Sequence, residues 1–341
     1  MDKPFFSTSI ALPITKATFL ASIVISFLGL ACGSGSVETE IATARQHSLS
    51  EMSELVGQMR DMAWTEEVDA AQELIEQQRP NQDVSSAPWL VAVSWLGRGA
   101  SFAERWDVAE RYAREAYDGS LALLNERELD EEDQLPTALG ASIEVLGRVQ
   151  DARGDRESAI SFLGKQREHY KGTSIETRIQ KNVMLLSLEG QPFPVLDVEH
   201  HLGESLPLVG SLDEKVIVVF FWAHWCGNCK QQLPILEQLH EDYSERGLEI
   251  LGPTQLYGYI SSGQHATPEQ EFEYLRGVYQ EQYPIPTWMS VPVSQQNFLD
   301  FGVSTTPTLV VIDRDGIVQL YNPGTLSYEE LSAYVERLLV T

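Results

Sequence analysis

The chain has 341 residues, of which 43% are hydrophobic, and a formal net charge of −26. This length and apolar content suffice for two ordinary domains, each with its own core. The excess of acidic residues argues against a nucleic-acid partner, because binding to phosphates requires an excess of Lys and Arg.

Residues 1–32 have the pattern of an export signal. After Asp2 the only charged residues are Lys3 and Lys16, and residues 17–31 are almost wholly apolar. Residues 28–33 resemble the lipobox of bacterial lipoproteins, in which the cysteine, here Cys32, carries the lipid. Gly29 departs from that pattern, since the family usually has Leu there. Ordinary signal cleavage and an uncleaved membrane anchor are the alternatives. All three interpretations place the body of the protein outside the cytoplasm, and residues 33–47 are then a tether.

Residues 48–188 show helical periodicity and no strand signal. The pairs Leu96-Gly97 and Leu146-Gly147 lie 50 positions apart, and Ala109 and Ala159 follow at the same spacing. Small residues at these places let paired helices approach closely, so the region faintly resembles tetratricopeptide-like helical hairpins. The alternative is a plain helical domain with no peptide groove. The acidic stretch 126–133 between the two units is predicted to be a solvated loop.

From Gln191 onward strands and helices alternate. Short strands are predicted at 206–209 and 248–251, and apolar strands at 216–222 and 308–312. The turn Arg314-Asp315-Gly316 predicts a hairpin into 317–321. Helices are predicted at 268–282, 295–301 and 328–339, and a further one directly follows the strand 216–222. The elements together predict a central mixed sheet with helices on both faces.

Cys226 and Cys229, separated by two residues, fall where the strand 216–222 passes into a helix. Two thiols at this spacing can carry out two-electron thiol–disulfide exchange. The helix N-terminus, with Lys230 nearby as a cation, favours a thiolate. We expect Cys226 to be the exposed nucleophile and Cys229 the deeper, resolving thiol. The alternatives are a zinc knuckle, a structural disulfide or two inert core thiols; zinc would want four ligands, and the chain has no second cysteine pair.

Several motifs around this pair occur together in one known family. They are Phe221 to Cys229, Pro234 in the following helix, Thr305-Thr306-Pro307-Thr308 before the late strand, and the turn Ile312 to Gly316. On these residues, segment 191–341 resembles the thioredoxin superfamily, specifically the TlpA-like (ResA-like) envelope thioredoxins. The resemblance implies an α/β thioredoxin fold, here preceded by an all-α region of helical hairpins.

The resemblance also assigns roles to individual residues. It implies a cis peptide bond at Thr306–Pro307, a loop there that presents backbone to an extended substrate, and a Trp225 that shields one side of the cysteines. Phe220 stands where cytosolic thioredoxins carry a buried aspartate, so that base is missing. His224 is expected either to be a solvated loop residue or, when protonated, to raise the thiolate fraction. The pair at 200–201 is expected to lie in a loop.

The sequence therefore predicts a thiol–disulfide oxidoreductase of the cell envelope that acts on protein disulfides. The resemblance implies reduction as the usual direction, a membrane-bound electron donor and attachment to the membrane through the N-terminal segment. No cofactor and no metal are implied, because electrons arrive and leave through protein thiols. The alternatives are a peroxiredoxin-like peroxidase and an interaction protein in which residues 37–188 bind a partner and the thioredoxin-like domain is a redox-sensitive latch.

Overall fold

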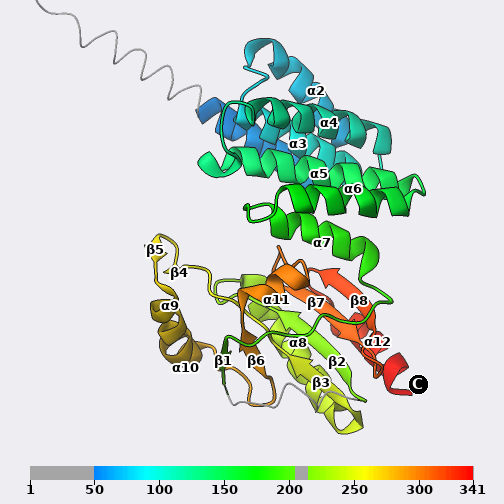
Figure 1. The fold of residues 1–341 in the computed structure, drawn as a ribbon, viewed down its shortest axis with the longest axis vertical. Coiled ribbons are helices and arrows are strands. Elements are labelled where there is room, and N and C mark those ends of the chain that lie inside the picture. Colours follow the sequence, from blue (N-terminus) through cyan, green and yellow to red (C-terminus); the bar gives the residue numbers. More distant parts are fainter. Residues whose placement is uncertain (1–49, 204–213, 341) are drawn as a thin grey trace, which may run out of the picture. The chain divides into compact units, whose positions relative to one another are not determined.

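The structure, a computed structural model, describes residues 50–203 and 214–340 (Figure 1). Cys32, the predicted tether at 33–47 and the strand predicted at 206–209 lie outside these ranges. Within them, no helix has both the length and the apolar composition needed to cross a membrane.

The first part of the described chain is helical, as predicted. A helix covers residues 50–64 and is followed by six further α-helices and two short 3-10 turns. These elements are α2 (Val68–Gln78), η1 (Arg79–Asn81), α3 (Ala87–Phe102), α4 (Trp106–Leu123), η2 (Leu129–Glu131), α5 (Gln134–Ala152), α6 (Arg156–His169) and α7 (Glu176–Ser187). Consecutive helices from α3 to α7 pack on one another.

The small residues noted in the sequence lie where these helices meet. A Cβ atom built on Gly97 of α3 would lie 3.2 Å from the backbone nitrogen of Ala113 in α4. A Cβ atom on Gly147 of α5 would lie 2.8 Å from the side chain of Leu163 in α6. The two Leu-Gly pairs therefore permit close helix approach, as predicted.

The acidic stretch between α4 and α5 is a connecting segment whose acidic side chains are mostly exposed, as predicted. It forms η2, in which Leu129 is buried, and Asp130 accepts hydrogen bonds from the backbone and hydroxyl of Ser174. The predicted solvated loop is therefore confirmed for these side chains, and one apolar side chain anchors the loop in the helical core.

The second part is built on a four-stranded mixed sheet of order β3-β2-β7-β8. The strands are β2 (Val216–Phe221), β3 (Leu248–Leu251), β7 (Thr308–Ile312) and β8 (Val318–Pro323). β2 runs parallel to β3 and antiparallel to β7, and β7 pairs with β8 in the predicted hairpin. Val, Ile and Phe side chains suit such a central strand, and all six residues of β2 are buried.

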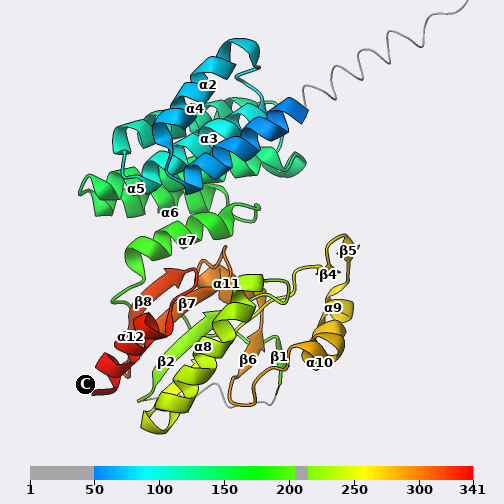
Figure 2. The same cartoon turned by 180° about the vertical axis from the view of Figure 1, so that it is seen from behind.

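Helices cover both faces of this sheet (Figures 1 and 2). Alternate residues of β2 face opposite ways. Val216, Val218 and Phe220 share a core with α8 (Gly227–Tyr243) and α12 (Tyr328–Val340). The intervening residues pack against α11 (Gln295–Asp300). The predicted arrangement is confirmed.

Two small antiparallel pairs lie outside the main sheet. β1 (His200–Leu202) pairs with β6 (Val291–Val293), and β4 (Tyr259–Ser261) pairs with β5 (Gln264–His265). The loop predicted for residues 200–201 is therefore wrong, because their backbone is paired in β1. The helix predicted at 268–282 is divided into α9 (Pro268–Tyr274), a π-helical turn η4 (Leu275–Tyr279) and α10 (Gln280–Gln282).

Helix α7 and the segment after it pack directly on the sheet-containing part. Leu188 shares a core with Phe298 and Phe301. The backbone N–H of Gly190 donates to the carbonyl of Val318 at 2.8 Å. Gly302 approaches α7 so closely that a Cβ atom there would lie 2.6 Å from the backbone nitrogen of Lys181. The backbone of α7 therefore lies directly against the sheet-containing part.

Candidate active site

The two cysteines lie where β2 ends and α8 begins. Cys226 is the N-cap residue of α8, and its Sγ accepts a hydrogen bond from the backbone N–H of Cys229 at 3.1 Å. The two side chains form a disulfide, with Cα atoms 5.2 Å apart. The unpaired N–H groups of a helix N-terminus favour negative charge, so this position stabilises a Cys226 thiolate once the disulfide is reduced. The predicted placement at the first turn of a helix is confirmed.

The predicted exposure of Cys226 is wrong. Its relative exposure is 5%, against 3% for Cys229, so both residues are buried in the disulfide state. Cys226 is covered because its Sγ lies 3.4 Å from the carbonyl oxygen of Thr306 and because it packs in the same core as Trp222. A client disulfide must therefore contact the residues around Cys226 when it reaches the sulfur.

The loop before β7 lies against the disulfide. Its Thr306–Pro307 peptide bond is cis, as the resemblance implies. The hydroxyl of Thr308 donates to the carbonyl of Thr305 at 2.7 Å, which ties the loop to the start of β7. The hydroxyl oxygen of Thr306 is buried without a hydrogen-bond partner. An unpaired buried polar atom beside the disulfide can be satisfied by a polar group of a bound molecule.

Trp225, which directly precedes Cys226, is 48% exposed. Its ring meets Tyr257 edge-on at a centroid distance of 5.5 Å and lies 6.3 Å from Tyr259. A half-exposed, laterally supported aromatic ring is the kind of residue that contributes strongly to protein contacts. Its substrate-binding role stays a prediction.

His224 is buried, not solvated. It is 4% exposed, and its ring contacts four tyrosines: Tyr257, Tyr259, Tyr274 and Tyr279. Its Nδ1 lies 3.7 Å from a carboxylate oxygen of Glu271. Burial lowers the pKa of His224, against the opposing effects of the Glu271 charge and nearby backbone groups. The ring is therefore neutral at neutral pH, and the expected effect of a protonated His224 on the thiolate is not supported.

Glu271 is a site residue that sequence reasoning missed. It is fully buried and accepts hydrogen bonds from the backbone N–H groups of Tyr257, at 2.9 Å, and Gly258, at 2.7 Å. It thereby fixes the loop that carries Tyr257 against Trp225. Glu271 stands four residues before the buried Leu275, so its place on the apolar face of the helical stretch was the signal that marked it.

The side of the disulfide nearest Cys229 faces an apolar cavity of about 210 Å³. Phe220 lines this cavity, so no carboxylate occupies the position of the missing base. Lys230, predicted as a cation close to the thiols, also lines it, and its Nζ lies 3.7 Å from the centre of the Tyr283 ring. Its charge is therefore engaged in a cation–π contact.

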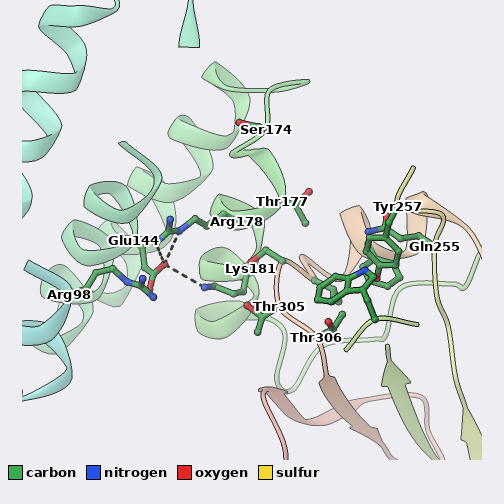
Figure 3. Close-up of a pocket in the computed structure, with 14 residues that line it drawn as sticks. Arg98, Glu144, Ser174, Thr177, Arg178, Lys181, Gln255, Tyr257, Thr305 and Thr306 are labelled. Carbon is green, nitrogen blue, oxygen red and sulfur yellow. Dashed lines mark hydrogen bonds and ion pairs between the residues drawn. The ribbon is translucent and has the colours of Figure 1, made fainter. Parts of the chain in front are cut away.

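A second, larger cavity of about 620 Å³ opens beside the Thr306 loop (Figure 3). Thr305 and Thr306 line it together with Trp225 and Tyr257, and the helical region supplies the facing wall. The charged residues of that wall are Arg98 of α3, Glu144 of α5, and Arg178 and Lys181 of α7. The sequence did not predict that these helices contribute to the site, because residues from three separate helices form the wall.

The described ranges contain no group of three or more His, Cys, Asp or Glu side chains arranged to hold a metal ion. His201, one of the histidines considered at the sequence level, shares a hydrogen bond of 3.0 Å with the hydroxyl of Ser290. Cys32 lies outside the described residues, so its lipidation stays a prediction.

The part of the chain that carries this geometry is similar to known proteins. Residues 213–318 match a family model described as thioredoxin-like. The thiol-disulfide oxidoreductase ResA of Bacillus thuringiensis is 26% identical over 158 residues, which cover 46% of this chain and 81% of that protein. The thioredoxin-like protein YneN of Bacillus subtilis is 24% identical over 144 residues, covering 42% and 76%.

Among solved structures, a putative thiol:disulfide interchange protein DsbE from Chlorobium tepidum is 24% identical, with a TM-score of 0.31, and the match covers 38% of this chain and 84% of that one. The sheet order and the family match together confirm a thioredoxin fold preceded by a helical region.

Proposed function

We propose that this chain, which carries a thioredoxin-like domain, is a protein-disulfide oxidoreductase of the cell envelope that works as a reductase. The observation that carries the proposal is the position of Cys226 at the N-cap of α8, bonded to Cys229 and next to the carbonyl of Thr306. The names of the matched relatives support the same type of chemistry.

The reaction begins with the reduced Cys226–Cys229 pair. The Cys226 thiolate attacks one sulfur of a client disulfide, forming a mixed disulfide and releasing the other client sulfur as a thiolate. The Cys229 thiolate then attacks the Cys226 sulfur, and the second client thiol leaves. Two electrons and two protons pass to the client, and the Cys226–Cys229 disulfide is formed.

Two contacts support Cys226 as the attacking thiol. The backbone N–H of Cys229 donates to its Sγ at 3.1 Å, an interaction that is stronger with a thiolate than with a neutral thiol. Cys229 instead faces the apolar cavity lined by Phe220, where burial disfavours a thiolate. The environment therefore supports Cys226 as the nucleophile and Cys229 as the resolving thiol.

Turnover requires a donor that returns two electrons to the Cys226–Cys229 disulfide. The resemblance to envelope thioredoxins supports a membrane-bound dithiol donor, and the apolar segment before Cys32 supports attachment of this chain to a bacterial membrane on its periplasmic side. Metabolic labelling with a palmitate analogue tests the lipid at Cys32. Label that is absent from the wild type, or that survives Cys32→Ala, contradicts it.

An insulin-reduction assay tests the enzymatic proposal. The wild-type protein should accelerate reduction in the presence of a dithiol donor, and Cys226→Ser should reduce the rate to that of the donor alone. Equal rates for the two proteins would contradict the proposal. Consumption of peroxide without an added disulfide would favour a peroxidase instead.

The reduction potential of the Cys226–Cys229 pair tests the direction. A reductase should have a potential close to that of thioredoxin, about −270 mV, whereas an oxidant lies near −120 mV. A measured potential near that of the oxidant would contradict the reductase assignment while leaving the proposed thiol–disulfide exchange intact.

A further inference from the structure

The cavity beside the Thr306 loop has a positive charge excess in an otherwise acidic protein. Its charged side chains are Arg98, Arg178, Lys181 and Glu144, so three cations share one carboxylate. The chain as a whole has a formal net charge of −26. A local reversal of sign inside a cavity concentrates the field there and attracts anions.

Glu144 is the counterion that all three cations share (Figure 3). Arg178 donates to its Oε2 at 3.0 Å, the Nζ of Lys181 lies 3.5 Å from the same oxygen, and the Nε of Arg98 lies 3.8 Å from Oε1. One carboxylate neutralises one of these charges. Two positive charges remain, and the buried Nε of Arg98 has no hydrogen-bond partner.

The pKa values of these groups reflect the same excess of positive charge. Burial lowers the pKa of Lys181; the Glu144 charge opposes this, and the charges of Arg178 and Arg98 add to it. Burial would raise the pKa of Glu144, yet the three cations hold it below its usual range. The cluster is therefore short of negative charge, since the neighbouring cations disfavour the charged forms of Lys181 and Arg98.

The other wall of the cavity belongs to the active site. Trp225, Thr305 and Thr306 line it, and the carbonyl oxygen of Thr306 lies 3.4 Å from the Sγ of Cys226. The buried hydroxyl oxygen of Thr306 is unpaired. The volume of about 620 Å³ is within the range of ligand-binding pockets. A molecule in the cavity would thus contact the loop that also contacts the disulfide.

We propose that this cationic cavity binds a carboxylate carried beside the disulfide of the client, namely an Asp or Glu side chain of the peptide segment that flanks the reacting cysteine. The proposal rests on the proposed function and specifies its substrate class. Arg178 and Lys181 supply charge-assisted hydrogen bonds to the carboxylate, and Thr306 can donate to it or to the client backbone. The helical region thereby acts as the specificity wall of the thioredoxin-like active site.

Two matched peptides test this. Both contain the same disulfide, flanked in one by Asp residues and in the other by Asn residues at the same positions. The wild type should reduce the Asp peptide with a kcat/KM at least about tenfold higher than that for the Asn peptide, as expected for a charge-assisted hydrogen bond in a partly desolvated site. The ratio should fall as salt is added, because screening weakens the attraction.

Variants that remove one positive charge show which residues cause the preference for the Asp peptide. Arg178→Gln leaves the cavity with one excess positive charge and should lower the Asp-to-Asn ratio, and Arg178→Gln combined with Lys181→Gln should bring it close to one. Lys165→Gln, an exposed residue of α6, removes the same charge away from the cavity and should leave the ratio unchanged. Circular dichroism establishes that the variants are folded, and the salt dependence of the wild type tests the proposal without any variant.

The outcomes separate the inference from the proposed function. Equal reduction of both peptides by the wild type overturns the carboxylate site and leaves the oxidoreductase intact. If neither peptide is reduced, the proposed function fails, and calorimetric binding of cysteine-free versions of the two peptides decides the inference. Equal binding of those two overturns it. Glutathione disulfide also carries carboxylates. If its reduction slows in Arg178→Gln while the two peptides are reduced equally, a peptide is the wrong source of the carboxylate.

Discussion

Replacing Gly302 with Ala should loosen helix α7 from the thioredoxin-like domain. Gly302 has a φ of 65°, in the left-handed region, and an added Cβ would meet the α7 backbone at the nitrogen of Lys181 (2.6 Å) and the carbonyl carbon of Gln180 (2.7 Å). Both atoms are backbone atoms, so no side-chain rotation relieves the contact. The helix or the loop that carries Gly302 must move.

Two separate effects set the magnitude. The left-handed conformation costs a non-glycine residue about 1–2 kcal/mol, and forced overpacking costs about 1–3 kcal/mol more. Gly154→Ala is a matched control, because Gly154 has a φ of 85° and a Cβ there would meet nothing within 4 Å. We therefore expect Gly302→Ala to lose about 1–3 kcal/mol more free energy of unfolding than Gly154→Ala.

Urea denaturation of the two variants and the wild type measures this difference. The Asp-to-Asn peptide ratio should also fall in Gly302→Ala, because Arg178 and Lys181 both lie on α7. If Gly302→Ala is no less stable than Gly154→Ala, α7 does not pack on this domain as described. The composition of the cationic cavity would then have to be revised.

Two further predictions concern polar residues packed inside the thioredoxin-like domain. Glu271→Ala leaves the backbone N–H groups of Tyr257 and Gly258 without their acceptor and should cost at least about 1–3 kcal/mol. Glu281→Ala at an exposed position should change stability little, and equal urea midpoints would contradict the role of Glu271. Burial lowers the pKa of His224, His201 and His240, so the unfolded chain takes up protons first as the pH falls. The free energy of unfolding should therefore decrease below about pH 6.5, by up to about 1.4 kcal/mol per pH unit for the buried His224 and by less for the partly exposed His201 and His240. The slope should be shallower in His224→Gln, and an unchanged slope would refute the burial argument.

The elements around the disulfide were predictable because their signals are local. The unbroken apolar run of β2 marks a strand buried on both faces, and the spacing of Leu236, Leu239 and Tyr243 marks the buried side of α8. The Asp-Gly turn marks the hairpin of β7 and β8. These patterns depend only on the period of each element, so the sheet and the cysteine position followed from them.

The rest of the site depends on contacts between distant segments. His224 is buried because four tyrosines from other elements surround it, and no local pattern near the cysteines indicates them. Glu271 lies on the apolar face of its helical stretch, but its partner, the backbone of Tyr257, lies in a separate loop that this pattern does not identify. The cationic wall requires α3, α5 and α7 to meet, which hydrophobic periodicity alone does not specify.

In the proposed mechanism the Cys226 thiolate attacks client disulfides and Cys229 resolves the product. This order of attack can be measured by mass spectrometry of reduced Cys229→Ser incubated with a disulfide-containing peptide, with the Cys226→Ser variant as the control. We expect a stable mixed disulfide on Cys226 in the first variant and much less adduct on Cys229 in the second, because Cys229 lacks the helix N-cap contact and is directed to an apolar cavity. Adduct formation only on Cys229, or none on either cysteine, would contradict the claim.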